Sequence, residues 1–352
     1  MVQVWTNGVG IPGAAARRAA DAEAAGFDGM TVVDSQNLSG DPYVALALAA
    51  KQTEHLLLGT GVTNPYTRHP AVTASSIATV QGESGGRAVL GIGRGDSALA
   101  HLGRAPVPVG KFEDYLRRVQ GYLRGEDVEF EPGGDLDRLG LANQPTASRL
   151  AWVRPGKYPK VPVDVAATGP KVIAAAARQA DQVTFAVGAD PERVKWGIET
   201  ARAARAAAGL DPDGLVFGAY VNVVVHDDPE EAQRIGEGGI SLFTRFSAMH
   251  GSVVGPASGE EDRVFREVHD AYDMTSHSRV GSQQAERIPG EFAGRFAILG
   301  PASYCLERLG ELVELGLRRL VVVGPSAGAS PGDARAADEA FATEVLPALR
   351  KL

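Results

Sequence analysis

The chain has 352 residues, with 35 basic and 43 acidic side chains and a formal net charge of −8. This acidic balance argues against nucleic acid as a partner, because phosphate backbones are bound by basic surfaces. Cys305 is the only cysteine, which excludes an intramolecular disulfide and a thiolate metal cluster and favours a reducing, cytoplasmic location. The sequence begins without a secretory signal pattern, and its apolar runs are too short for a membrane span, so we expect no membrane partner.

Short apolar runs alternate with longer Ala-rich segments along the whole chain. The apolar runs predict eight strands, at 2–6, 30–34, 56–63, 88–92, 161–166, 182–187, 215–225 and 320–323. The segments between them predict helices at 13–25, 42–53, 70–83, 111–123, 171–180, 191–208, 229–249, 304–315 and 334–349. Continuous apolar strands that alternate with helices are typical of parallel sheets buried on both faces. The chain is therefore predicted to form one (β/α)8 TIM barrel over residues 1–352.

Two stretches interrupt this alternation, at about 125–160 and 251–295, and both are rich in turn-forming and charged residues. Long excursions from a compact domain are usually functional loops or lids. We expect both to be insertions at the C-terminal face, over the mouth of the barrel.

Active sites of such barrels lie at the carboxyl ends of the strands. The most informative segment there is Gly59–Ala71, with the sequence GTGVTNPYTRHPA. This segment resembles the luciferase-like monooxygenase superfamily, and in particular its coenzyme F-420-dependent branch, which includes methylenetetrahydromethanopterin reductases. The resemblance implies a cis peptide between Gly61 and Val62 that backs the central ring of a flavin or deazaflavin, with Thr60 and Asn64 beside it.

Two further glycine-containing loops carry the resemblance. The segment Ala166–Lys171, AATGPK, lies between a strand and a helix, where backbone N–H groups favour an anion. The resemblance implies that this loop grips the cofactor phosphate. The segment Gly91–Ser97, GIGRGDS, departs from the dinucleotide fingerprint, and the next helical pattern is distant. The cofactor-binding residues expected from these two loops and the sixth strand end are Gly91, Gly93, Arg94, Ala167, Thr168, Gly169, Pro170, Lys171 and Gly188.

Three residues are candidates for proton handling or substrate orientation. Asp34 ends the second strand, where the F-420 branch commonly has an acidic residue beside the deazaflavin. His69 is titratable near neutral pH, but it also directly precedes a helix. Asn7 lies at the end of the first strand, where methanopterin reductases carry a glutamate, so activity on methanopterin is not expected.

The resemblance therefore predicts hydride transfer between reduced F-420 and a small organic acceptor, by a protein that forms a homodimer. The phosphate loop does not discriminate between cofactors, and an FMN-dependent monooxygenase is the alternative. A non-redox aldolase or isomerase would need a Schiff-base lysine or a carboxylate pair at the strand ends, and neither is evident. A non-catalytic cofactor-binding relative is the third alternative. The histidines show no metal-ligand spacing.

Overall fold

Eight parallel strands form a closed barrel in the computed structural model, which describes residues 2–131, 133–154 and 156–351. The strands are β1 (Gln3–Gly8), β2 (Gly29–Val32), β3 (Leu57–Thr60), β4 (Ala88–Ile92), β7 (Val163–Ala167), β8 (Gln182–Phe185), β9 (Val216–Val225) and β11 (Arg319–Val323). Each strand pairs with the next one in this series, including β8 with β9 and β9 with β11. The pairing of β11 with β1 closes the barrel. The predicted (β/α)8 barrel is confirmed.

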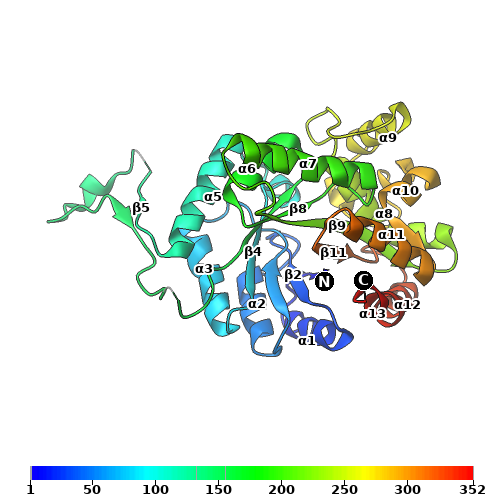
Figure 1. Cartoon of the computed structure of the whole chain (residues 1–352), viewed down its shortest axis with the longest axis horizontal. Helices are drawn as coiled ribbons and strands as arrows, with labels where there is room; N and C mark the ends of the chain where they lie inside the picture. Colours follow the sequence, from blue (N-terminus) through cyan, green and yellow to red (C-terminus); the bar gives the residue numbers. More distant parts are fainter. Residues whose placement is uncertain (1, 132, 155, 352) are drawn as a thin grey trace.

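A ring of helices surrounds the strands (Figure 1). It consists of α1 (Ala15–Ala25), α2 (Pro42–Ala50), α3 (Pro70–Glu83), α5 (Val109–Arg124), α6 (Pro170–Gln179), α7 (Pro191–Ala207), α11 (Ala302–Glu314) and α12 (Pro331–Ala340), which continues through a π-turn into α13 (Leu346–Leu349). Helix α2 begins where predicted, because the Asp41 carboxylate accepts the N–H groups of Tyr43 and Val44 and Pro42 fits the first turn. Asp190 caps α7 in the same way.

The chain departs from simple alternation after β9. This strand has ten residues, and its last three pair with the additional short strand β10 (Ile298–Gly300). Helix α8 (Pro229–Phe246) packs on β9 and β10 and against α9 (Gly259–Asp270) and α10 (Gly290–Phe296), and it is α11 that contacts α7 in the ring. The predicted insertion at 251–295 therefore lies at the C-terminal face, and α8 belongs to the same cover.

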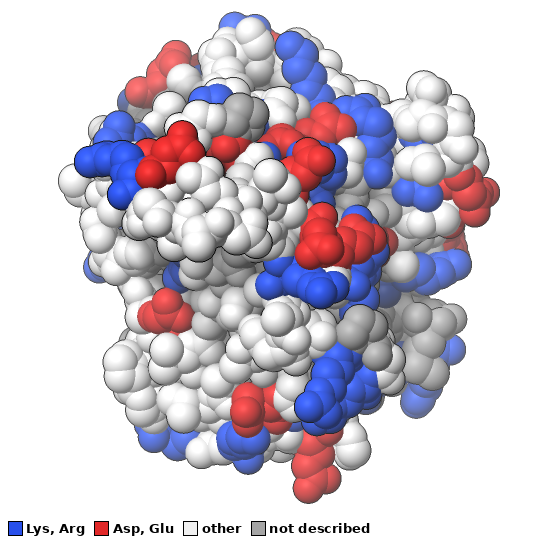
Figure 2. Space-filling model, turned by 90° about the vertical axis from the view of Figure 1, so that its left-hand side faces the viewer, with Lys and Arg blue, Asp and Glu red and all other residues white. Residues whose placement is uncertain are grey.

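The excursion at 125–160 lies at the opposite end, so its predicted position over the mouth is wrong. It joins the end of α5 to the start of β7 and contains the hairpin of β5 (Val128–Glu129) and β6 (Ala147–Ser148). In a parallel barrel, a helix-to-strand connection reaches the amino ends of the strands. The hairpin projects away from the barrel (Figure 1), and on this side acidic and basic side chains lie next to one another (Figure 2).

The hydrophobic core has two parts. One fills the layer between the strands and the ring helices, with residues such as Leu58, Ile77 and Val165 fully buried. The other starts inside the barrel at Trp5 and continues toward the carboxyl ends of the strands, to Phe296 and the helices of the cover. Among the described residues, none of the helices combines the length and the apolar character that crossing a membrane requires.

Candidate active site

A cavity of about 780 Å³ opens at the carboxyl ends of the barrel strands. The ends of β1, β2, β3, β4 and β7 form one wall, and α8 with residues 274–279 forms the other. The second wall is largely apolar, with Leu242, Phe243, Phe246 and Met249 among its residues. The cavity thus lies where a (β/α)8 barrel places its chemistry, beneath the cover that the excursion after β9 supplies.

The end of β3 forms the base of this cavity. The peptide between Gly61 and Val62 is cis, as expected from the sequence. A side chain at Gly61 would lie 2.4 Å from the hydroxyl of Thr31, so only glycine fits there. The Val62 side chain lies beside Gly93, where an added Cβ would be 3.2 Å away. Gly61, Val62 and Gly93 all line the cavity, so few side-chain atoms project from this wall.

Asp34 is a buried carboxylate at the cavity wall, with 3% of its surface exposed. Its Oδ1 accepts a hydrogen bond from Gln36 at 2.6 Å, and its Oδ2 accepts from the Thr63 hydroxyl at 2.6 Å and Arg68 Nη1 at 2.5 Å. The other guanidinium nitrogen of Arg68 lies 2.9 Å from Asp41. Burial opposes the charge of Arg68, but the hydrogen bond and charge of Asp34 outweigh it and raise its pKa. Asp34 is thus held in one orientation, with its charge compensated.

The loop after β7 presents the start of α6 to the cavity. Thr168 and Gly169 line the cavity, and the Thr168 hydroxyl donates to the Ala186 carbonyl at 3.1 Å. Gly169 is the N-cap residue of α6, and no side chain caps the helix there. The free N–H groups of this ten-residue helix therefore remain suited to an anion. Pro170 and Lys171 are exposed and do not line the cavity.

Three other predicted site residues, Asn7, Asn64 and Arg94, also line the cavity. Asn64 is 1% exposed, and its side-chain nitrogen has no hydrogen-bond partner within the described structure. Arg94 donates from Nε to the Val107 carbonyl at 2.6 Å, and burial lowers its pKa.

The remaining predicted residues lie outside the lining. His69 is exposed and caps α3, where its Nδ1 accepts the N–H of Ala71 at 3.2 Å. Thr60 and Gly91 join β3 to β4 through a hydrogen bond from the Thr60 hydroxyl to the Gly91 carbonyl at 2.6 Å. Ala167 is buried at the end of β7, and Gly188 has a φ of +85° and packs against the Phe296 ring.

Sequence reasoning missed a linked polar group that joins the loop after β4 to the opposite wall. Asp96 forms an ion pair with Arg245, and the Arg245 guanidinium lies 4.5 Å from the centre of the Tyr272 ring. Burial raises the pKa of Asp96, although Arg245 opposes that shift. Asp96 precedes the short helix α4 (Ser97–Ala100), so the expectation that no helix follows the Gly91–Ser97 loop closely is wrong.

The same group continues through Tyr272 to His277. The Tyr272 hydroxyl lies 2.9 Å from His277 Nδ1, and the His277 ring meets the His101 ring edge-on at 6.1 Å. Burial raises the pKa of Tyr272 to about 12. Burial, followed by the charges of Arg245 and His101, lowers the pKa of His277 to about 4. At neutral pH Tyr272 is thus protonated and His277 is uncharged, and one hydrogen bond joins them. No local sequence signal pairs residues of three separate elements.

Arg193 attaches the cover to the barrel. It is 3% exposed and donates hydrogen bonds to the carbonyls of Val187, Val254 and Pro256 and to the Ser247 hydroxyl. Burial lowers the pKa of Arg193 to about 10. Arg193 thus links the end of β8 to the residues that follow α8.

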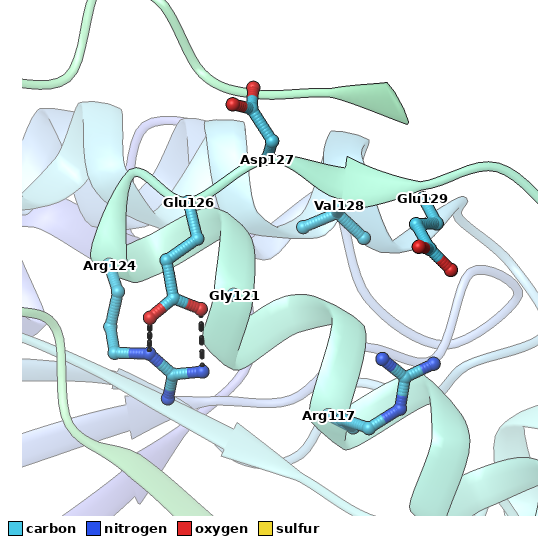
Figure 3. Close-up of a pocket in the computed structure, with 7 residues that line it drawn as sticks. All are labelled: Arg117, Gly121, Arg124, Glu126, Asp127, Val128 and Glu129. Atoms are coloured by element: carbon cyan, nitrogen blue, oxygen red, sulfur yellow. Dashed lines mark hydrogen bonds and ion pairs between the residues drawn. The ribbon is translucent and has the colours of Figure 1, made fainter. Parts of the chain in front are cut away.

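Another hollow, of about 340 Å³, lies between α5 and β5 (Figure 3). In it Arg124 forms two hydrogen bonds with the Glu126 carboxylate, at 2.6 and 2.9 Å, and Arg117 pairs with Asp114. These side chains are solvent-exposed and already compensated, so the hollow offers no group poised for chemistry.

Comparisons with known proteins agree with this geometry. The 5,10-methylenetetrahydromethanopterin reductase of Methanolobus tindarius is 30% identical over 315 residues, which cover 86% of this chain and 88% of that protein. The solved F-420-dependent tetrahydromethanopterin reductase from Methanopyrus kandleri superimposes with a TM-score of 0.73 at 23% identity, over 98% of this chain and 99% of that one. An F-420-dependent secondary alcohol dehydrogenase solved with an F-420–acetone adduct gives 0.71 at 20% identity, over 99% of both chains. The family model for luciferase-like monooxygenases matches residues 4–319. The chain therefore belongs to the luciferase-like monooxygenase family and is an oxidoreductase of that family.

Proposed function

We propose that this protein is an F-420-dependent oxidoreductase that transfers a hydride between the deazaflavin and an organic acceptor. The main observation behind the proposal is that one continuous cavity runs from the flat wall of Gly61, Val62 and Gly93 to the N-terminus of α6, which no side chain caps. A planar ring system with a phosphate-bearing side chain needs both features. The similarity to F-420-dependent reductases supports this cofactor over FMN.

The residues present fit such a cofactor. The cavity of about 780 Å³ is within the usual range of roughly 300–1,000 Å³ for cofactor sites. Asn64 Nδ2 and the Tyr220 hydroxyl are buried without partners in the described structure, and both residues line the cavity. Buried polar atoms normally have partners, so these two are suited to polar atoms of a bound ring. When bound, the deazaflavin supplies the hydride chemistry.

The protein's own residues bind, orient and exclude water. Thr168, Gly169 and the first N–H groups of α6 would hold the phosphate, with Arg94 on the neighbouring loop after β4. Asp34, just after β2, and Asn7 of β1 line the cavity and would orient the reacting groups. Because Asp34 is fixed by Thr63, Gln36 and Arg68, it retains its position when the acceptor enters.

Substitutions at Gly169 can test cofactor binding without disturbing the fold. Its backbone is extended, and an added Cβ would meet no atom within 4 Å, so Gly169→Asp and Gly169→Asn should both fold and cap α6. The Asp carboxylate would repel the phosphate, and we expect its F-420 dissociation constant to be about tenfold higher than that of the Asn variant. Titration with F-420 and, separately, FMN measures this, with the exposed Lys171→Ala as a control. Equal F-420 affinity in the two variants would show that the phosphate does not bind at α6. Tight FMN binding without F-420 binding would favour the monooxygenase alternative.

The same family assignment supports a homodimer, which we propose to form through α2 and α3. Helix α2 contains no charged residue, yet Val44 and Leu48 are 61% and 55% exposed, and Val72 of α3 is 50% exposed. A helix that is apolar on all sides is normally buried. We expect Leu48→Glu to convert a dimer into a monomer in light scattering, whereas Leu139→Glu, on the exposed hairpin segment, leaves the dimer intact. A monomeric parent protein would rule out this interface.

A further inference from the structure

The charged side chains around the cavity differ in whether they have a partner of opposite charge. The carboxylates in its lining belong to Asp34 and Asp96, and each is paired with an arginine, Arg68 and Arg245 respectively. The cations in the lining are Arg94 and Arg279, and neither has a carboxylate within 4.0 Å in the described part of the chain. The cavity is therefore lined by two uncompensated guanidinium groups in a protein whose net charge is −8. A cleft of this kind attracts anions.

The backbone around Arg279 is held in an uncommon conformation. Ser278 has a φ of +56°, the left-handed region that non-glycine residues rarely occupy. The segment packs directly on α8, where a Cβ at Gly238 would lie 2.5 Å from the Ser278 carbonyl oxygen. Val280 donates its N–H to the Ala327 carbonyl at 2.9 Å. The segment therefore docks between α8 and the loop after β11, which places the exposed Arg279 at the rim of the cavity.

Arg279 lies away from the proposed phosphate site. Arg279 bridges to Ala327, which follows β11, whereas Thr168 and Gly169 follow β7. Strands β8 and β9 separate β7 from β11 in the barrel. Arg94, by contrast, follows β4, the direct neighbour of β7. The two guanidinium groups thus flank the cavity on different sides, with Arg94 on the side of the proposed phosphate site.

We propose that Arg279 binds an anionic group of the acceptor, a carboxylate or a phosphate ester, and so determines substrate class. This inference rests on the proposed function, because it assigns the second anion site to the substrate of that reaction. A guanidinium presents paired N–H donors that match such oxyanions. The apolar side chains of α8, including Phe243 and Phe246, accommodate the rest of the molecule. The cofactor's acidic tail is the other source of the same chemistry, and the experiment separates the two.

The test compares 4-acetylbenzoate with its methyl ester, two ketones that differ in one negative charge. Binding to the full chain, with and without F-420, is measured by calorimetry and ligand-observed NMR. We expect the parent protein to bind the acid about tenfold more tightly than the ester. Arg279→Gln should abolish that preference, Arg279→Lys should keep part of it, and ester binding should not change. Arg287→Gln removes an exposed arginine of the same segment that does not line the cavity, and it should retain the parent's preference.

The absence of any acid-over-ester preference in the parent protein would overturn the proposal, as would a preference that survives Arg279→Gln. An increase in the F-420 dissociation constant of Arg279→Gln, with the acid preference intact, would assign the arginine to the cofactor tail instead. Failure of every variant and the parent to bind F-420 would refute the proposed function alone, because the probe measurements without cofactor still report on the anion site.

Discussion

The half-buried His277 makes the stability of this protein depend on pH in a defined window. Its folded-state pKa is about 4, against an ordinary value of 6.5, chiefly because burial disfavours the imidazolium. As the pH falls below 6.5 the unfolded chain gains a proton that the folded chain does not accept, so stability falls until the pH reaches about 4. Between pH 6.5 and pH 5 the loss is about 2 kcal/mol, since one pKa unit corresponds to about 1.4 kcal/mol.

We expect His277→Gln to remove this component. Urea unfolding at about pH 7.5 and about pH 5 should show the parent losing about 2 kcal/mol more than the variant across that interval. His55→Gln, at a histidine with 87% of its side chain exposed, serves as the matched control and should behave like the parent. Hydrogen exchange should locate the acid-induced opening at residues 272–279. An equal loss in the parent and in His277→Gln would refute the reasoning.

Three further changes test the framework that holds the site. Gly91→Ala should abolish folding into soluble protein, because its Cβ would lie 2.0 Å from a β3 carbonyl oxygen, whereas Gly82→Ala, in an open position of α3, should raise the melting temperature. Arg193→Met should lower the free energy of unfolding by about 3–5 kcal/mol, measured with urea, because it leaves buried carbonyls without a donor. Arg319→Met should cost about 3–5 kcal/mol in the same assay, since Asp164 is 1% exposed and pairs with it at 2.8 Å.

Much of the barrel could be predicted because its signals are local. The helix at 70–83 and the strand at 88–92 have the predicted bounds, since Pro70 fixes the helix start and the apolar run fixes the strand. The third strand ends at Thr60, earlier than predicted. Regular pairing is interrupted at Gly61 and Val62 and resumes only as an isolated bridge between Thr63 and Ile92. Composition does not record such an interruption.

The opposite wall could not be predicted because its contacts are long-range. Asp96 meets Arg245 across 149 positions, and the arginine then reaches Tyr272 of a third segment. Nothing in the sequence around 251–295 indicates which residues return to the barrel. The hairpin at 125–160 was misplaced for a related reason. Glycine and charge predict a surface loop at either end of a barrel, and only the count of strands and helices before it fixes the end.

The two walls of the cavity have different proposed roles. The wall built by β1 to β7 carries the features that the proposed cofactor needs, and its geometry follows from strand ends and one helix start. The other wall is an excursion that packs on the barrel through a hydrophobic cluster and is also tied to it by Arg193 and by the ion pair of Arg245 with Asp96. Changes at 274–279 can therefore alter which acceptor binds while the cofactor wall stays intact. It follows that exchanging this segment for that of a relative should change the acceptor preference and leave the F-420 dissociation constant within about twofold. A loss of F-420 binding on exchange would mean that the two walls are not independent.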